Sequence, residues 1–161
     1  MRVNFAVLWD LDGTLIDTAD LHVYAFTEAL RKIGYNVSEE HAKAFRQRLG
    51  KRFVEIIKEI FPNMPEGEIE RLKNIRREIF LSRVDLIKPL PPSRLLPIVS
   101  RMYPTALITS SNRQFVEIIL DNFKWRSYFN VVITGDDVKR GKPNPEPVLL
   151  ALKKLGSHKV C

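Results

Sequence analysis

The chain has 161 residues, enough to bury one substantial core, and its 45% hydrophobic and 28% charged content is ordinary for a globular protein. Polar residues interrupt every apolar run well before the ~20 residues of a membrane span, so neither a membrane span nor a signal segment is expected. The single cysteine allows neither an internal disulfide nor a cysteine-based metal cluster. A cytoplasmic protein is therefore expected. The net charge of +7 suggests a nucleic-acid partner, but the excess of Lys and Arg is shared almost evenly between residues 18–92 and the remainder, which argues against one.

The first predicted element is a buried strand over residues 3–9, because this run is short, apolar and followed by a turn with a glycine. Residues 17–86 then show helical spacing throughout, which predicts about four helices and no strand. In the first of these, apolar side chains recur every four residues, at Leu21, Ala25, Ala29 and Ile33. Gly34 is expected to end that helix, Ser38 to cap the next one, and Gly50 to break it.

Residues 88–92 contain three prolines and predict a linker, since prolines cannot continue a helix. Ser93 is expected to cap a helix that reaches Met102. After it, two further strands alternate with two helices, and Gly156 is expected to end the last helix. The predicted ranges are 105–109 and 130–134 for the strands, and 115–123 and 145–155 for the helices.

This order of elements predicts an α/β fold, a parallel Rossmann-like sheet with flanking helices, into which a helical domain is inserted. Residues 1–17 and 89–161 are assigned to the α/β core, and residues 18–88 to the insert. Ligands of open parallel sheets bind beyond the carboxyl ends of the strands. The residues that follow the predicted strands are therefore the first candidates for a site.

Four polar residues lie at these strand ends. Asp10 and Asp12 follow the first strand, Thr109 ends the second, and Lys142 lies in the loop after the third. Asp10 could attack phosphorus as a nucleophile, and Asp12 could act as general acid and base. Thr109 and Lys142 could bind phosphoryl oxygens, with Mg²⁺ offsetting charge from the other side. The alternative for the two aspartates is a hydrated turn with a helix cap, and for Thr109 a strand-end hydroxyl that satisfies a nearby backbone group.

Three segments together resemble the haloacid dehalogenase superfamily of phosphotransferases. They are Asp10–Asp17, which begins Asp-Leu-Asp-Gly-Thr, the apolar run Ala106–Asn112 that contains Thr109 and Ser110, and Gly141–Glu146 with its Gly-Lys-Pro-x-Pro-Glu pattern. The helical insert is similar to the four-helix cap of phosphoglycolate-phosphatase-like and β-phosphoglucomutase-like members. Dehalogenases of the superfamily lack a second aspartate where this chain has Asp12, so its presence favours phosphoryl transfer.

The resemblance implies a Mg²⁺-dependent phosphatase that acts on a small phosphorylated substrate through an aspartyl-phosphate intermediate. It implies Asp10 as the nucleophile, Asp12 as the general acid and base, and Thr109, Ser110 and Lys142 as phosphate-binding residues. Mg²⁺ would be held by Asp10 and by Asp12, through its backbone carbonyl. A sugar phosphate in place of water as acceptor would make the protein a mutase instead.

The insert carries the one concentrated run of positive charge, at Lys43, Arg46, Arg48, Lys51 and Arg52. A solvated helix face is the preferred interpretation, ahead of a nucleic-acid surface. In similar capped proteins this position holds the cap loop that faces the active site. Lys51 and Arg52 are therefore further candidates, for binding a carboxylate or a second phosphate of the substrate.

One family motif has no counterpart in this sequence. The fourth motif is an acidic pair after a fourth strand, whereas Glu146 is the only acid that follows Lys142. Asp136 and Asp137 precede Lys142 and are interpreted as loop and capping residues. The chain therefore resembles a family member cut before its fourth strand, with an exposed edge on the first strand, weak metal binding and poor turnover. The alternative function is a catalytically weak or inactive relative that binds a phosphorylated ligand or partner.

Overall fold

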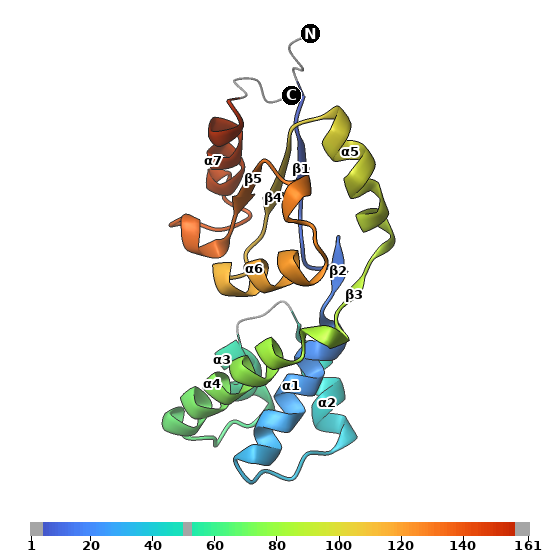
Figure 1. The fold of residues 1–161 in the computed structure, drawn as a ribbon. Helices are drawn as coiled ribbons and strands as arrows, with labels where there is room; N and C mark the ends of the chain where they lie inside the picture. The colour runs from blue at the N-terminus through green and yellow to red at the C-terminus, as the bar shows by residue number, and fades with distance from the viewer. Residues whose placement is uncertain (1–4, 50–52, 157–161) are drawn as a thin grey trace. The chain divides into compact units, whose positions relative to one another are not determined.

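The computed structural model describes residues 5–49 and 53–156, and the chain divides into two compact units (Figure 1). One unit spans Met1–Asp17 and Lys88–Cys161, and the other spans Thr18–Ile87. We refer to them as the α/β unit and the helical unit. The second boundary lies one residue earlier than expected, because Lys88 pairs with Asp17 in a short strand and so belongs to the α/β unit.

The α/β unit is built on a parallel three-stranded sheet, as the alternation of strands and helices predicted. β1 (Val7–Trp9) pairs with β4 (Thr105–Ile108), and β4 pairs with β5 (Val131–Ile133). Every residue of the central strand β4 is buried, whereas β1 is an edge strand among the described residues. Because the three strands are parallel, Asp10 and Thr109 leave the sheet at the same edge.

Helices flank the sheet, and Figure 1 shows the strands lying between α5 (Leu96–Met102) and α7 (Glu146–Leu155). Ala151 of α7 belongs to a buried cluster with three side chains of the sheet, Ala106, Ile108 and Ile133. Gly156 ends α7 with a left-handed φ of +70°, as predicted. The remaining helix, α6 (Arg113–Asn122), begins after Asn112, whose Oδ1 accepts a hydrogen bond from the amide of Phe115. Two short 3₁₀ helices, η3 (Arg126–Tyr128) and η4 (Gly135–Asp137), lie on either side of β5.

Two expectations for residues 88–93 were wrong. The predicted linker contains β3 (Lys88–Pro89), which pairs antiparallel with β2 (Ile16–Asp17). Ser93 does not cap a helix, because it lies inside the 3₁₀ helix η2 (Pro91–Leu95) and donates a hydrogen bond to the carbonyl of Leu90 at 2.7 Å. Consecutive prolines have φ preset near the helical value, so a turn of helix begins at Pro91, before the serine.

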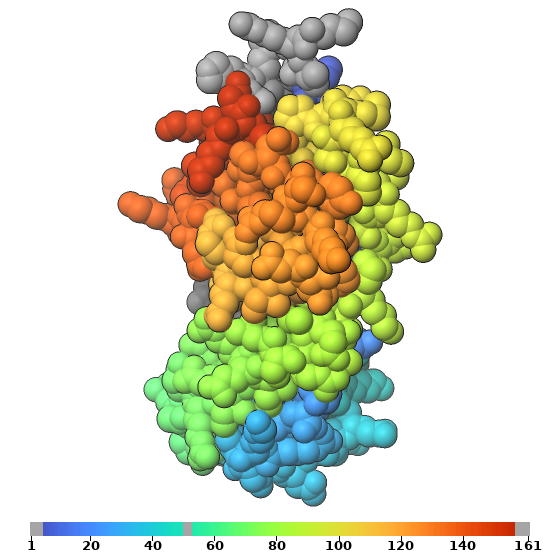
Figure 2. Space-filling view, in the orientation of Figure 1, coloured from blue at the N-terminus to red at the C-terminus, as the bar shows by residue number. Residues whose placement is uncertain are grey.

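The helical unit contains four α-helices and no strand among its described residues, as predicted. They are α1 (Ala19–Lys32), α2 (Glu39–Arg46), α3 (Phe53–Ile60) and α4 (Glu66–Ser82), with a 3₁₀ turn η1 (Val84–Leu86) at the end. α1 and α4 pack along each other, and Figure 2 shows their surfaces side by side. The chain that the structure describes has no helix with both the length and the apolar character needed to cross a membrane.

The predicted helix signals of this unit are confirmed. Leu21, Ala25 and Ala29 of the four-residue repeat are fully buried. Gly34, with φ +91°, follows the end of α1. The hydroxyl of Ser38 accepts a hydrogen bond from the amide of His41, while the ring of His41 accepts one from the amide of Ser38. The imidazole thus takes the place that a glutamate usually has in this capping arrangement. Gly50, the predicted break after α2, lies outside the described residues.

Candidate active site

The loop after β1 is organised around the buried side chain of Leu11. The backbone carbonyl of Leu11 accepts hydrogen bonds from the amides of Thr14, Leu15 and Ile16. These bonds reverse the direction of the chain within a few residues. Gly13 makes this turn possible because its φ is +77°, a conformation that costs little only for glycine. The flanking residues Asp10 and Asp12 are more accessible than Leu11, and their carboxylates contact residues of other loops.

Asp10 is paired with Lys142, which lies 132 positions away in the sequence. The Nζ of Lys142 is 2.7 Å from Oδ1 of Asp10, and the amide of Leu11 donates a second hydrogen bond to the same oxygen at 2.9 Å. Both hydrogen bonds end on Oδ1, so Oδ2 has no donor among the residues that the structure describes. The Asp10 side chain is 44% exposed. One oxygen is therefore fixed while the other is accessible to a ligand.

Asp12 is held by hydroxyl groups that follow β4. The hydroxyl of Ser111 donates to Oδ2 of Asp12 at 2.8 Å, and the hydroxyl of the buried Thr109 lies 3.4 Å from the same oxygen. The amide of Ser111 donates in turn to the Thr109 hydroxyl at 3.0 Å. The contacts of Asp12 with Thr109 and Ser111 depend on the parallel sheet, which brings the ends of β1 and β4 together.

Ser111 was not among the residues singled out from the sequence, although it lies within the second motif. A hydroxyl two residues after a strand-ending threonine is the only local signal that could have indicated it. Ser110, which was singled out, is exposed after β4. The backbone carbonyl of Ser110 lies close to Gly135, at the point where the loop after β4 crosses the loop after β5. A Cβ on Gly135 would lie 2.5 Å from that carbonyl oxygen. Gly135 also donates its amide to the carbonyl of Ser111 at 2.9 Å.

The loop that carries Lys142 is fastened by Glu146, the last acid of the sequence. Its two carboxylate oxygens accept hydrogen bonds from the amides of Lys139 at 2.8 Å and Arg140 at 3.2 Å. The backbone hydrogen bond from Lys139 is the main reason why the pKa of Glu146 lies below its usual value. Asn144 continues the loop, since its side chain accepts from the amide of Glu146. Glu146 is therefore a positioning residue for Lys142.

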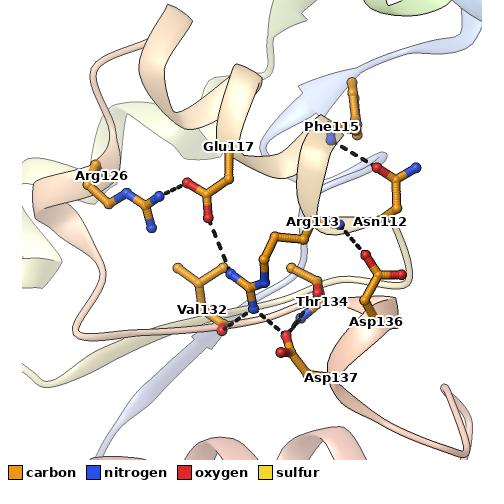
Figure 3. Close-up of polar contacts among 9 residues, drawn as sticks. All are labelled: Asn112, Arg113, Phe115, Glu117, Arg126, Val132, Thr134, Asp136 and Asp137. Carbon is orange, nitrogen blue, oxygen red and sulfur yellow. Dashed lines mark hydrogen bonds and ion pairs between the residues drawn. The ribbon is translucent and has the colours of Figure 1, made fainter.

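Asp136 and Asp137 have the structural roles that the sequence suggested (Figure 3). Asp136 accepts a hydrogen bond from the amide of Arg113 at the first turn of α6, at 2.8 Å. Asp137 accepts from the amide and the hydroxyl of Thr134, at 2.7 and 2.8 Å, and from the guanidinium of Arg113. Burial alone would raise the pKa of Asp137, but these hydrogen bonds outweigh it, and the pKa lies below the usual value. Both acids thus tie α6 to the end of β5.

Figure 3 also shows how Arg113 joins these elements. Its guanidinium contacts Glu117 one turn further along α6, and Glu117 also pairs with Arg126 of η3. The network therefore uses Asp136 and Asp137 to hold α6 against the end of β5.

Asp10 and Asp12 are the described residues whose chemistry suits a hard cation such as Mg²⁺. Magnesium in enzyme sites is commonly bound through one or two carboxylates, with water and substrate phosphate completing the octahedron, and the carboxylate of Asp10, whose side chain is 44% exposed, fits that donor set. The described residues contain no group of three or more His, Cys, Asp or Glu placed to hold a metal ion. Lys51 and Arg52, the candidates in the helical unit, lie outside the described residues.

Known proteins are similar to this chain in sequence and in fold. The pyrophosphatase PpaX of Oceanobacillus iheyensis is 30% identical over 155 residues, which cover 94% of this chain and 69% of that protein. A candidate β-phosphoglucomutase structure from Thermotoga maritima has a TM-score of 0.71 at 28% identity, covering 94% of this chain and 71% of that one. The structure of CbbY from Rhodobacter sphaeroides with xylulose-1,5-bisphosphate has a TM-score of 0.70 at 25% identity, covering 94% and 72%.

The family profile of the haloacid dehalogenase-like hydrolases matches residues 7–160, which is nearly the whole chain. The match includes Asp10 and Asp12, the strand end at Thr109, and Lys142, which the structure gathers at one edge of the sheet. Sequence, fold and site geometry agree, and the chain belongs to the haloacid dehalogenase-like hydrolase family.

Proposed function

We propose that this protein is a Mg²⁺-dependent phosphatase that transfers the phosphoryl group of a small metabolite to Asp10 and then to water. The observation that carries the proposal is the state of the Asp10 carboxylate. Its Oδ1 is held by Lys142 and by the amide of Leu11, while the side chain as a whole is 44% exposed. A carboxylate fixed in this way loses little orientational freedom when it attacks.

In the first step, Oδ2 of Asp10 forms a bond to phosphorus while the bond from phosphorus to the leaving oxygen breaks. The leaving oxygen takes a proton from Asp12, which must hold that proton when the substrate binds. The Ser111 and Thr109 hydroxyls orient the Asp12 carboxylate for this transfer. In the second step Asp12 takes a proton from water, whose oxygen attacks phosphorus and releases phosphate and the Asp10 carboxylate.

Negative charge on the phosphoryl oxygens is offset by Lys142 and by the hydroxyls after β4. Thr109 and Ser110 are the proposed phosphate-binding groups, and Ser110 is the exposed one of the two. Mg²⁺, held by Asp10 and the Asp12 carbonyl, would supply further positive charge to the phosphoryl oxygens. Preorganised charges of this kind act where charge develops in the transition state.

The substrate is proposed to carry a second anionic group besides the phosphoryl group that is transferred. Pyrophosphate, which the name of PpaX indicates, and the bisphosphate bound to CbbY both have this property. Lys51 and Arg52 of the helical unit remain proposed contacts for that group. A chain with one cysteine forms no internal disulfide, which fits a proposed site of action in the reducing cytoplasm.

The proposal is tested by Mg²⁺-dependent hydrolysis of p-nitrophenyl phosphate. The variants are Asp10→Asn and, as a matched control, Asp121→Asn on the exposed surface of α6. The wild type and the control should turn over with Mg²⁺ and lose activity with a chelator, and acid-quenched wild type should carry phosphate on Asp10. Activity retained by Asp10→Asn would overturn the assignment of the nucleophile. An inactive wild type that still binds pyrophosphate in calorimetry would favour the alternative, a binding protein of the same family.

A further inference from the structure

The orientation of Asp12 depends on where Ser111 is held. The Ser111 hydroxyl donates to Oδ2 of Asp12 at 2.8 Å, whereas the Thr109 hydroxyl is further from that oxygen, at 3.4 Å. Ser111 lies in the loop after β4, beyond the end of the strand, so the sheet alone does not fix its position. Whatever holds this loop therefore also holds the hydroxyl against the Asp12 carboxylate.

The loop after β5 holds Ser111 through the backbone. The amide of Gly135 in η4 donates to the carbonyl of Ser111 at 2.9 Å. The two loops are in close contact at this point, since a Cβ on Gly135 would lie 2.5 Å from the carbonyl oxygen of Ser110. Closely packed groups transmit a displacement rather than absorb it. A shift of η4 would therefore move Ser111 as well.

The side chain of Arg113 fixes η4 to the first turn of α6 (Figure 3). Its guanidinium donates to Oδ2 of Asp137, the same oxygen that accepts the amide and the hydroxyl of Thr134 at 2.7 and 2.8 Å. Thr134 and Asp137 lie on either side of Gly135 in the chain, so these contacts hold the turn that carries the glycine amide. The Asp137 side chain is 21% exposed, and an ion pair shielded from water is worth more than one on the open surface.

The guanidinium is oriented by further acceptors. One of its nitrogens is 3.2 Å from Oε1 of Glu117 in the next turn of α6, and the nitrogen that contacts Asp137 is 3.5 Å from the carbonyl of Val132 in β5. A planar guanidinium serves several acceptors at once, whereas the single nitrogen of a lysine would keep the contact with Asp137 and lose the others. Arg126 pairs with the second oxygen of Glu117, at the end of the network away from η4.

We propose that Arg113 is a positioning residue for Asp12, because it keeps the Ser111 hydroxyl at the place where it meets the carboxylate. The contacts form a closed ring, which runs along the chain from Ser111 to Arg113, through Asp137 to Gly135, and back to Ser111. The role of Arg113 rests on the proposed function, in which Asp12 protonates the leaving oxygen. Arg113 acts on that proton transfer through Ser111.

The first test compares Arg113→Met with Arg126→Met, a matched change at the other end of the network. For each variant kcat is measured on glycerol phosphate, whose leaving oxygen needs a proton, and on p-nitrophenyl phosphate, whose leaving group departs as a stable anion. Arg113→Met should lower the ratio of the two kcat values by about 10-fold and leave KM within about 2-fold, because a misplaced acid slows only the step that needs it. Arg126→Met should change the ratio by less than about 2-fold, and Arg113→Lys should recover most of it. A ratio that is unchanged in Arg113→Met, or that falls equally in Arg126→Met, would overturn the inference.

A second test asks whether Arg113 acts through Ser111. Ser111→Ala should lower the same ratio, and adding Arg113→Met to it should cause no further fall beyond about 2-fold. Residues that act through one contact are not additive in this way, whereas independent residues multiply their effects. Effects that multiply would overturn the route through Ser111.

The third test does not depend on turnover. Amide hydrogen exchange of Gly135, measured by NMR, should be about 10-fold faster in Arg113→Met than in the wild type, the range for losing one hydrogen bond to a charged group. Exchange should be unchanged in Arg126→Met and at Leu107 in the buried strand β4. Unchanged exchange at Gly135 would overturn the inference, and so would equal acceleration at Leu107, since the arginine would then stabilise the whole unit. A wild type that hydrolyses neither ester counts against the proposed function alone, and exchange at Gly135 then decides whether Arg113 holds the loops.

Discussion

The charged groups of the α/β unit and those of the helical unit interior are arranged in opposite ways. In the α/β unit each carboxylate of the site has a donor: Lys142 for Asp10, Ser111 for Asp12, and backbone amides for Glu146. In the helical unit the guanidinium of Arg76 packs against the Phe53 ring, and no carboxylate of the described residues pairs with it. The first arrangement is complete without ligand, which suits chemistry on a fixed phosphoryl group. In the second, an aromatic ring packs against the charge, and the guanidinium has no compensating carboxylate among the described residues.

The largest expected effect comes from removing the acid of the complete site. Asp12→Asn should lower kcat for an alkyl ester such as glycerol phosphate by about 10²–10⁴-fold, the range of general acid–base catalysis. Hydrolysis of p-nitrophenyl phosphate should fall less, because p-nitrophenolate is a stable anion that leaves without a proton. Steady-state rates on the two esters measure the difference. Equal losses would mean that Asp12 does not protonate the leaving group.

The neutral His22 beside Arg76 should make stability depend on pH. The unfolded chain protonates this histidine near its ordinary value of 6.5, whereas the folded chain does so near 4. Between these values the unfolded state binds more protons, so stability falls as pH decreases from 6.5 to 4, by up to about 3 kcal/mol. Urea denaturation at several pH values should show this loss, and His22→Gln should reduce it. An imidazole NMR titration of His22 with a midpoint near 6.5 would contradict the buried, neutral state.

The crossing of the loops after β4 and β5 should be sensitive to a single methyl group. Gly135→Ala places a Cβ 2.5 Å from the carbonyl oxygen of Ser110, so the backbone must move. We expect a loss of about 1–3 kcal/mol in the free energy of unfolding, together with a lower kcat. Gly67→Ala in α4 is the control, since its new Cβ meets no atom within 4 Å and alanine favours the helix by up to about 1 kcal/mol. Similar changes in both variants would argue against a steric cause at Gly135.

The smallest effect is expected at Glu146, which positions the Lys142 loop from the surface. The pKa of Glu146 is lower in the folded chain than in the unfolded chain, so its ionised carboxylate stabilises the fold. This stabilisation is complete above the ordinary glutamate pKa and is lost as the pH falls through the pKa of the folded chain. Glu146→Gln should therefore lower the melting temperature slightly at pH 7. The difference in melting temperature between wild type and variant should disappear at pH values below the ordinary glutamate pKa. Its kcat should fall by only a few-fold. A difference in melting temperature that is constant down to acid pH would exclude the ionised carboxylate as the cause.

Much of the fold could be predicted because it depends on local patterns. The four-residue repeat of Leu21, Ala25 and Ala29 indicates which face of the helix is buried. Gly34 and Gly156 follow helix ends because glycine adopts a positive φ at little cost. The failures were also local, at Ser93 and the prolines before it. Proline was interpreted as an interruption, whereas Pro89 lies in a two-residue strand and Pro91 starts a helical turn.

The sequence by itself determined the order of the main helices and of the parallel strands, the family and the catalytic candidates. Asp10, Asp12, Thr109 and Lys142 each follow a strand, and parallel strands end at one edge. Only the tertiary structure decided which atoms meet: Lys142 with one oxygen of Asp10, Ser111 with Asp12, and Arg76 with Phe53. Periodicity reports which face of an element is buried, but it does not report what packs against that face. The pairing of charges depends on contacts between residues far apart in the chain, and these exist only when the chain is folded.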